Sequence, residues 1–223
     1  MTLPGALVFD FDGLVLDTET CTYESAVTIF REHGVDLDLA WWQSILGTAN
    51  HPHWTDILAA AVDRPIDRAA LKVQREELRM ARLTELPPCA GVVPLLDEAR
   101  AAGVPNAVGS SSPAEWVVGH LDRLGLLDRF AVVATSDDVG GDPRRTKPAP
   151  DIFLAAAEAL GVEPAACVVL EDSPNGVLAA RAAGMPVVAV PGPMTADLDF
   201  GAADLVVESL VDVSLGTLGA LVA

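Results

Sequence analysis

The feature that most constrains this chain is a short apolar run that ends abruptly in acid. Residues 7–18 read LVFDFDGLVLDT, and the run from Ala6 to Phe9 is typical of a buried strand. Asp10 and Asp12 follow, two residues apart. In extended backbone such residues face the same way, so both carboxylates can point into one space before Gly13 lets the chain turn away.

Two carboxylates in one space repel each other unless a cation or a shared proton lies between them. Mg²⁺ is the cation that this pattern favours, because it takes hard oxygen ligands and is often held by one or two carboxylates together with phosphate oxygens. The acidic pair alone is equally typical of a solvated turn at a strand end. The rest of the chain therefore has to decide between these two interpretations.

Behind this stretch the chain becomes helical. Apolar residues recur with helical spacing, Gly34 is a plausible helix end, and no strand pattern occurs between Thr18 and Leu86. Helices are expected over residues 19–33, 39–46, 54–62 and 69–86. We expect the tryptophans of this block, Trp41, Trp42 and Trp54, to form its apolar core. We expect three basic residues, Lys72, Arg75 and Arg79, to lie on a solvated helix face.

From Pro87 and Pro88, which break the last of these helices, strands and helices alternate. Strands are expected over residues 105–109, 130–135, 166–170, 186–190 and 205–207, helices over 92–102, 113–124, 151–160 and 175–183, and a surface loop over 140–145. This alternation predicts an α/β fold with a Rossmann-like parallel sheet core, residues 1–17 and 88–223, and an inserted all-helical cap domain, residues 18–87.

The charge and hydropathy of the chain limit the classes of molecule that it can bind. The net charge is −18, from 32 acidic and 14 basic residues, which disfavours nucleic acid because a phosphate backbone demands basic patches. No apolar run approaches the about 20 residues that span a bilayer, and the N-terminus lacks the basic start of a signal peptide. We expect a cytoplasmic monomer that binds no membrane. Any phosphate site must then concentrate its positive charge locally, which singles out Lys147, one of only two lysines.

Polar residues follow three of the later strands, where active sites of open α/β sheets lie. Ser110 to Ser112 precede a helix and can bind an anion, although a plain serine N-cap gives the same pattern. Lys147 opens the string KPAPD, in which a helix start explains the prolines and the acid but not the lysine. Glu171 and Asp172 end a buried strand, where two acids are costly unless they meet a cation.

Four short strings resemble, in order, the four motifs of the haloacid dehalogenase superfamily of phosphohydrolases. They are DFDGLVLDT, SSS, KPAPD, and the acidic pair followed by Asn175. The resemblance spans residues 6 to about 190 and looks closest to the β-phosphoglucomutase-like and phosphoglycolate-phosphatase-like branch. It implies a Mg²⁺-dependent phosphatase that hydrolyses a small phosphate monoester, such as a sugar phosphate or a phosphoglycolate-like compound, through an aspartyl-phosphate. Asp12 disfavours the dehalogenases, which lack an acid at that place.

The resemblance also implies a role for each matched residue. Asp10 would be the nucleophile, Asp12 the general acid and base, Ser110 a ligand of the phosphoryl group, and Lys147 the neutralising cation. The metal ligands would be Asp10, the Asp12 carbonyl and Asp172, with Glu171 nearby or through water. Substrate contacts are expected from Gly13, Thr18, Glu19, Gly47, Asn50, Ser111, Ser112 and Asn175.

Two alternatives stay open at this point. A β-phosphoglucomutase-type mutase needs charge in the cap for a second phosphate, and the matching positions here are Thr22, Leu46 and Asn50, none of which is charged. His51 and His53 could supply polar contacts. A non-catalytic binding protein on the same fold is the other alternative, which the intact catalytic positions disfavour.

Overall fold

The computed structural model describes residues 2–45, 52–62 and 64–222. The chain divides into two compact units, Met1–Leu16 with Pro87–Ala223 and Asp17–Leu86, which we call the core and the cap. The core is therefore made of two segments of sequence. That the core is the catalytic unit stays a prediction.

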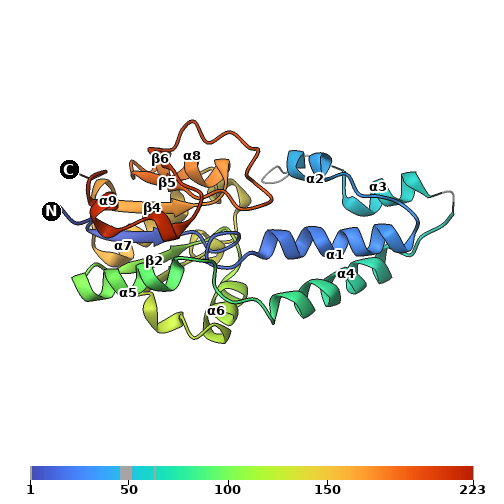
Figure 1. The fold of residues 1–223 in the computed structure, drawn as a ribbon, viewed down its shortest axis with the longest axis horizontal. Coiled ribbons are helices and arrows are strands. Elements are labelled where there is room, and N and C mark those ends of the chain that lie inside the picture. Colours follow the sequence, from blue (N-terminus) through green and yellow to red (C-terminus); the bar gives the residue numbers. More distant parts are fainter. Residues whose placement is uncertain (1, 46–51, 63, 223) are drawn as a thin grey trace. The chain divides into compact units, whose positions relative to one another are not determined.

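A six-stranded sheet forms the centre of the core (Figure 1), and each pair of neighbouring strands is parallel. The strand order is β3-β2-β1-β4-β5-β6. The strands are β1 (Ala6–Phe9), β2 (Asn106–Gly109), β3 (Val132–Ala134), β4 (Cys167–Glu171), β5 (Val187–Ala189) and β6 (Leu205–Val206). The predicted α/β class with a parallel sheet is confirmed. The strand that carries the first motif lies at the sheet's centre, between β2 and β4.

Helices cover the sheet because its strands are apolar on both faces. The helices of the core are α5 (Val92–Ala102), α6 (Ala114–Arg123), α7 (Asp151–Leu160), α8 (Pro174–Ala182) and α9 (Leu215–Gly219). Alternate residues of β1, Ala6 and Val8, pack in one apolar cluster with Phe153 of α7 and Val177 of α8. Successive strand residues face opposite sides, so β1 presents Leu7, which is fully buried, to the other face.

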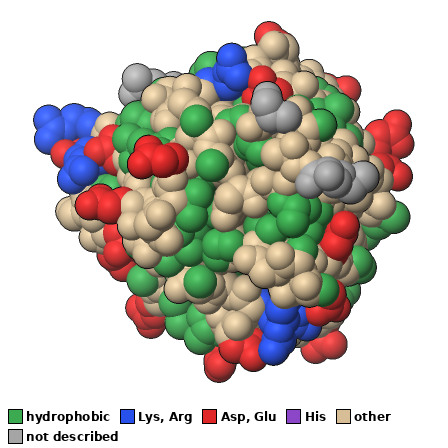
Figure 2. Space-filling view, turned by 90° about the vertical axis from the view of Figure 1, so that its left-hand side faces the viewer, with side chains coloured by type: hydrophobic (Ala, Val, Ile, Leu, Met, Phe, Trp, Pro, Cys, Tyr) green, Lys and Arg blue, Asp and Glu red, His purple; other side chains and the backbone are tan. Residues whose placement is uncertain are grey.

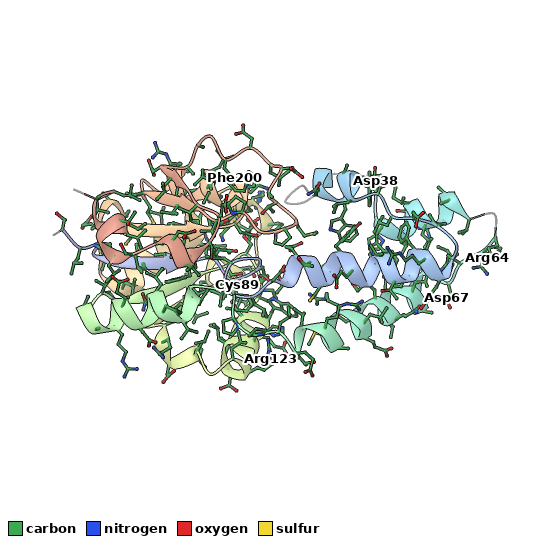
Figure 3. All side chains as sticks on the ribbon, in the orientation of Figure 1. Asp38, Arg64, Asp67, Cys89, Arg123 and Phe200 are labelled. Atoms are coloured by element: carbon green, nitrogen blue, oxygen red, sulfur yellow. The ribbon has the colours of Figure 1, made fainter. Side chains whose placement is uncertain are left out.

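The cap consists of the four helices expected between the first motif and the double proline: α1 (Thr18–Glu32), α2 (Leu39–Ile45), α3 (Trp54–Ala61) and α4 (Arg68–Leu83). Helices α1 and α4 lie side by side. The cap has its own apolar cluster, in which Trp42 and Trp54 are buried and Trp41 packs at the margin, as predicted. Asp67, labelled in Figure 3, accepts hydrogen bonds from two backbone N–H groups in the first turn of α4.

Two kinds of detail differ from the sequence-based expectation. The segment after β3 contains two 3₁₀ turns, Ser136–Val139 and Pro143–Arg145. The second lies inside the surface loop expected over residues 140–145, and it starts at Asp142, which accepts a hydrogen bond from the Arg144 N–H. The expected solvated face of α4 holds only for Lys72, because Arg75 and Arg79 are half-buried. The guanidinium carbon of Arg75 lies 5.1 Å from the ring centroid of Trp54, so the ring covers one face of the guanidinium.

The surface agrees with the acidic composition. The face of the core in Figure 2 shows acidic side chains spread among apolar and neutral ones, with basic side chains in small separate groups. Within the described residues, no helix combines the length and the apolar character that crossing a bilayer requires.

Candidate active site

Three strands and one loop bring the polar residues of the core together. Asp10 follows β1 directly, and its backbone N–H donates to the Leu170 carbonyl of β4 at 2.9 Å. Ser110 follows β2, and its N–H donates to the Ala134 carbonyl of β3 at 3.0 Å. The sheet ladder thus continues one residue past the strand ends. It fixes both residues at the carboxyl edge of the sheet, where the sequence predicted the site.

A buried lysine joins two of the acids. Lys147 Nζ contacts Asp10 Oδ1 and lies 2.7 Å from Glu171 Oε1, with side-chain exposures of 7%, 8% and 0% for the three residues. Its ammonium also lies 4.7 Å over the ring of Phe153. Burial lowers the pKa of Lys147, but Asp10 and Glu171 outweigh that effect and raise it above its ordinary range. The lysine therefore stays an ammonium at neutral pH.

Glu171 is held on both of its oxygens. Oε2 accepts hydrogen bonds from the backbone N–H of Ser173 at 2.8 Å and from its hydroxyl at 3.0 Å, while Oε1 faces Lys147. A Cβ on Gly176 would lie 1.7 Å from Oε1, so only glycine fits beside this carboxylate. Glu171 is thus a fixed negative charge that orients the lysine.

Three buried acids form a cluster that can hold a cation. Carboxylate oxygens of Asp10, Glu171 and Asp172 all lie within 4.8 Å of one another. Burial raises the pKa of Asp10 to about 8; Lys147 lowers it, whereas Glu171 and Asp12 raise it further. A cation bound among these oxygens would replace the proton on Asp10 and favour the ionised form of this carboxyl.

The donor set and the space around it fit Mg²⁺. All side-chain ligands on offer are hard carboxylate oxygens, with no thiol or imidazole among them. Gly13 has a φ of +89°, and a Cβ there would lie 1.9 Å from Asp172 Oδ2. The backbone of the first motif therefore lies directly against the Asp172 carboxylate, which fits the predicted metal position.

Asp12 lies outside this carboxylate cluster and is held separately. Its Oδ2 accepts a hydrogen bond from the Ser112 hydroxyl at 2.6 Å and lies 3.4 Å from Ser110 Oγ. Its Oδ1 accepts from the indole Nε1–H of Trp116 at 2.9 Å. The two acids of the first motif therefore have different partners. Asp10 faces cationic and acidic groups, whereas Asp12 faces neutral hydrogen-bond donors.

The remaining predicted site residues are spread over both units. In the core, Ser111 is exposed, and its hydroxyl accepts a hydrogen bond from the backbone N–H of Lys147 at 3.3 Å. Asn175 is half-buried in the first turn of α8. In the cap, Thr18 and Glu19 open α1, with Thr18 buried. Gly47 and Asn50, together with Leu46 and His51, lie outside the described residues. His53 caps α3, since its Nδ1 accepts the Thr55 N–H at 3.2 Å.

The sequence-based reasoning missed four residues that support the site. Ser173 holds Glu171 and Phe153 lies under Lys147, while Trp116 donates to Asp12 and packs against His120. The spacing of Trp116 and His120, four residues apart on a helix that directly follows Ser110 to Ser112, was a readable signal that both share one face. The roles of Ser173 and Phe153 had no such signal, because they depend on side-chain contacts.

A protein-family model, described as haloacid dehalogenase-like hydrolase, matches residues 4–184. The chain belongs to the haloacid dehalogenase-like hydrolases. This confirms the resemblance that the four motifs carry, and the match includes every motif from Asp10 to Asn175.

Members of this family with similar sequences are named as phosphatases. The chain is 40% identical to a Bacillus subtilis (strain 168) protein named "Putative phosphatase YhcW" over 213 residues, which cover 96% of the chain and 95% of the relative. It is 34% identical to the fructose-1-phosphate phosphatase YqaB of Escherichia coli (strain K12) over 190 residues, 82% of the chain and 95% of the relative. The enzyme class is that of a phosphoric monoester hydrolase.

A solved structure supports the fold at high coverage. A haloacid dehalogenase family hydrolase from Deinococcus radiodurans R1, with bound phosphate and sodium, superposes with a TM-score of 0.79 at 29% identity. The superposition covers 99% of this chain and 98% of that one. Both units of the chain thus have counterparts in one member of the family.

Proposed function

We propose that this chain is a Mg²⁺-dependent phosphatase that hydrolyses a small sugar phosphate through a phosphorylated Asp10. The observation that carries the proposal is the buried arrangement of Asp10, Lys147 and Glu171 at the end of the central strand. A buried acid that contacts a fixed ammonium is suited to attack phosphorus, because the ammonium offsets the repulsion between two anions.

The proposed metal would be held by the carboxylates of Asp10 and Asp172 and by the Asp12 carbonyl, with Glu171 beside it. When bound, Mg²⁺ supplies positive charge next to the nucleophile and the phosphoryl oxygens. Among the chain's own groups, Lys147 orients Asp10 and neutralises part of the substrate's charge, and Glu171 keeps Lys147 in place. Ser110 and the N–H groups of its loop would receive the phosphoryl oxygens.

The reaction then proceeds in two transfers. In the first, a bond forms between an Asp10 oxygen and phosphorus, the bond from phosphorus to the leaving oxygen breaks, and Asp12 gives that oxygen its proton. In the second, Asp12 takes a proton from water while the water oxygen bonds to phosphorus and the Asp10–phosphorus bond breaks. Phosphate leaves and both acids return to their starting states. One acid held by charged groups and one held by neutral donors suits this division of labour.

The substrate class rests on the relatives and on the cap. A relative that matches 82% of this chain is named for fructose 1-phosphate, which favours a sugar phosphate. Thr22, where the resemblance to the mutases leads one to expect a histidine, donates its hydroxyl to the Thr18 carbonyl at 2.8 Å within α1. That hydroxyl is engaged by its own helix and carries no charge for a second phosphate. Hydrolysis with water as the acceptor is therefore favoured over phosphosugar transfer.

The test combines a covalent trap with product analysis. The protein is mixed with a panel of phosphate monoesters, including fructose 1-phosphate and phosphoglycolate, with Mg²⁺, and quenched in acid. Mass spectrometry of the peptide that spans Asp10 should show one added phosphoryl group, and Asp10→Asn should show none. An exposed acid of α6 gives the matched control, Asp122→Asn, which should behave as wild type.

Two results would overturn the proposal in different ways. With β-glucose 1-phosphate and a trace of its 1,6-bisphosphate, glucose 6-phosphate that forms faster than free phosphate would make the chain a mutase. No Mg²⁺-dependent turnover of any ester in the panel, an aryl phosphate included, would favour a non-catalytic binding protein.

A further inference from the structure

The side chain of Trp116 lies in the first turn of α6, directly after the serine loop Ser110–Ser112. The helix start is fixed from outside, because Asp137 Oδ2 accepts the Ala114 N–H at 2.9 Å. Side chains in a helix lean toward its N-terminus, so a residue in the first turn reaches back over the loop before it. This places the indole N–H on Asp12 Oδ1 at 2.9 Å.

The indole ring is held by its neighbours and has little freedom to follow Asp12 elsewhere. His120, one helical turn further on, is buried, and its ring meets that of Trp116 edge-on at 4.2 Å between centroids. His120 also stacks with Phe11, at 6.2 Å between ring centroids, and Phe11 is the residue between Asp10 and Asp12. The contacts therefore run from the first motif to α6 and back to Asp12. A ring fixed in this way presents its N–H at one place.

The partners of the two Asp12 oxygens differ in what they can do. An indole N–H donates and never accepts, so the lone pair of Oδ1 that faces Trp116 cannot carry a proton. A serine hydroxyl both donates and accepts, so Oδ2 beside Ser112 and Ser110 can be protonated or ionised without losing its partners. The two contacts therefore favour the oxygen beside the serine loop as the one that exchanges the proton.

We propose that Trp116 is a positioning residue, which orients Asp12 so that Oδ2 delivers and removes the proton of the reaction. The inference rests on the proposed function, in which Asp12 protonates the leaving oxygen. Trp116 itself touches no reacting atom; it acts through Asp12. The serine loop that would bind the phosphoryl group and the oxygen that carries the proton are then on the same side of the acid.

Proton delivery matters only when the leaving oxygen needs a proton, which gives the test its selectivity. Trp116→Phe keeps an aromatic ring against His120 and removes the donor. Values of kcat/KM are measured with Mg²⁺ for p-nitrophenyl phosphate, phenyl phosphate and an alkyl phosphate, in order of increasingly basic leaving groups. General acid catalysis is worth about 10²–10⁴-fold, so a misplaced acid should cost about 10- to 100-fold on the alkyl ester and less than about threefold on the p-nitrophenyl ester.

Trp54→Phe is the matched control. It also removes an indole N–H, but in the cap, where that N–H has no hydrogen-bond partner among the described residues. Its effect should be the same for all three esters. An equal loss on all three with Trp116→Phe, or no loss, would overturn the positioning role, while a wild type that turns over none of them would overturn the proposed function instead.

A second measurement needs no turnover. The chain has four tryptophans, and the Nε1–H resonance of Trp116 is identified in a ¹⁵N correlation spectrum by its loss in Trp116→Phe. In Asp12→Ala this resonance should move further than the other three, because only it loses a carboxylate acceptor. A Trp116 resonance that stays in place would show that the contact does not exist in solution and would overturn the proposal.

Discussion

The buried site of the core and the ion pairs of the cap use charge in opposite ways. In the core, Lys147 and Glu171 are almost fully buried and fix each other, and the acids around them stand at strand ends. In each ion pair of described cap residues, such as Arg82 with Glu24, at least one side chain is about half exposed. Ion pairs on the surface of the core, such as Arg181 with Asp204, are exposed in the same way. Buried, fully partnered charges hold one geometry, whereas exposed ones are weak and readily replaced. We infer that the chemistry is fixed in the core and that substrate choice can change in the cap.

The largest expected effect on activity comes from replacing the proposed nucleophile in the core. Asp10→Asn should lower kcat on the order of 10⁶-fold, because it removes the covalent nucleophile while keeping the side chain's size. Circular dichroism should show an unchanged fold. A variant within about tenfold of wild type would contradict the assignment of Asp10, whichever substrate is used.

A pair of glycine substitutions compares the two units directly. Gly13 in the core and Gly34 in the cap both have positive φ, +89° and +74°, but a Cβ on Gly13 would lie 1.9 Å from Asp172 Oδ2, while one on Gly34 would meet nothing within 4 Å. Gly34→Ala should cost about 1–2 kcal/mol of unfolding free energy from backbone strain alone, with activity retained.

Gly13→Ala should cost the same strain and in addition displace Asp172, so activity should fall about 100-fold or more. Thermal denaturation and initial rates of both variants provide the measurement. Equal losses of activity in the two variants would show that the close approach of Gly13 to Asp172 has no bearing on the site.

The raised pKa of Asp10 predicts a pH-dependent affinity for Mg²⁺. Burial raises this pKa to about 8 in the metal-free protein, and a cation binds the ionised carboxylate, so protons compete with Mg²⁺ below that value. As pH falls from about 8 to about 6, the Kd of Mg²⁺ should rise by about tenfold per unit, with one proton released on binding. Calorimetry in buffers of different ionisation enthalpy measures both quantities. Asp10→Asn should bind more weakly with little pH dependence, and a flat wild-type profile would contradict the raised pKa.

The smallest effect concerns the cap. Arg75 is half-buried and its guanidinium lies over the ring of Trp54. Burial and Arg79 lower the pKa of Arg75, whereas Glu19, an expected substrate contact, raises it. If the cap selects the substrate through this charge, Arg75→Met should raise KM for a sugar phosphate about tenfold and change kcat little, since a contact to an ionised group is worth about 1.5–3 kcal/mol. Arg31→Met, an exposed change in α1, should leave KM unchanged. An unaltered KM in Arg75→Met would remove this arginine from the recognition site.

Local sequence patterns predict one part of the fold and the site, and contacts between residues distant in the sequence determine the rest. The order of strands and helices, and the grouping of Asp10, Ser110 and Lys147 at one sheet edge, follow from local strings because a parallel sheet collects its strand ends. The support from Trp116 depends on how α6 packs against the first motif, which a string does not encode. The 3₁₀ turns after β3 depend on single capping contacts such as that of Asp142, and the expected cap contacts at Gly47 and Asn50 lie outside the described residues.

The position of β1 at the centre of the sheet has a consequence for how the protein is made. During synthesis β1 emerges before every other strand, yet its two neighbours begin about a hundred residues later, at Asn106, and later still, at Cys167. The four helices of the cap can pack together while β1 still lacks both of its neighbouring strands. Until β4 leaves the ribosome, the apolar strand Ala6–Phe9 keeps an open edge to which other chains could add. A stalled or truncated product that ends before Cys167 should therefore aggregate through the strand that carries the nucleophile.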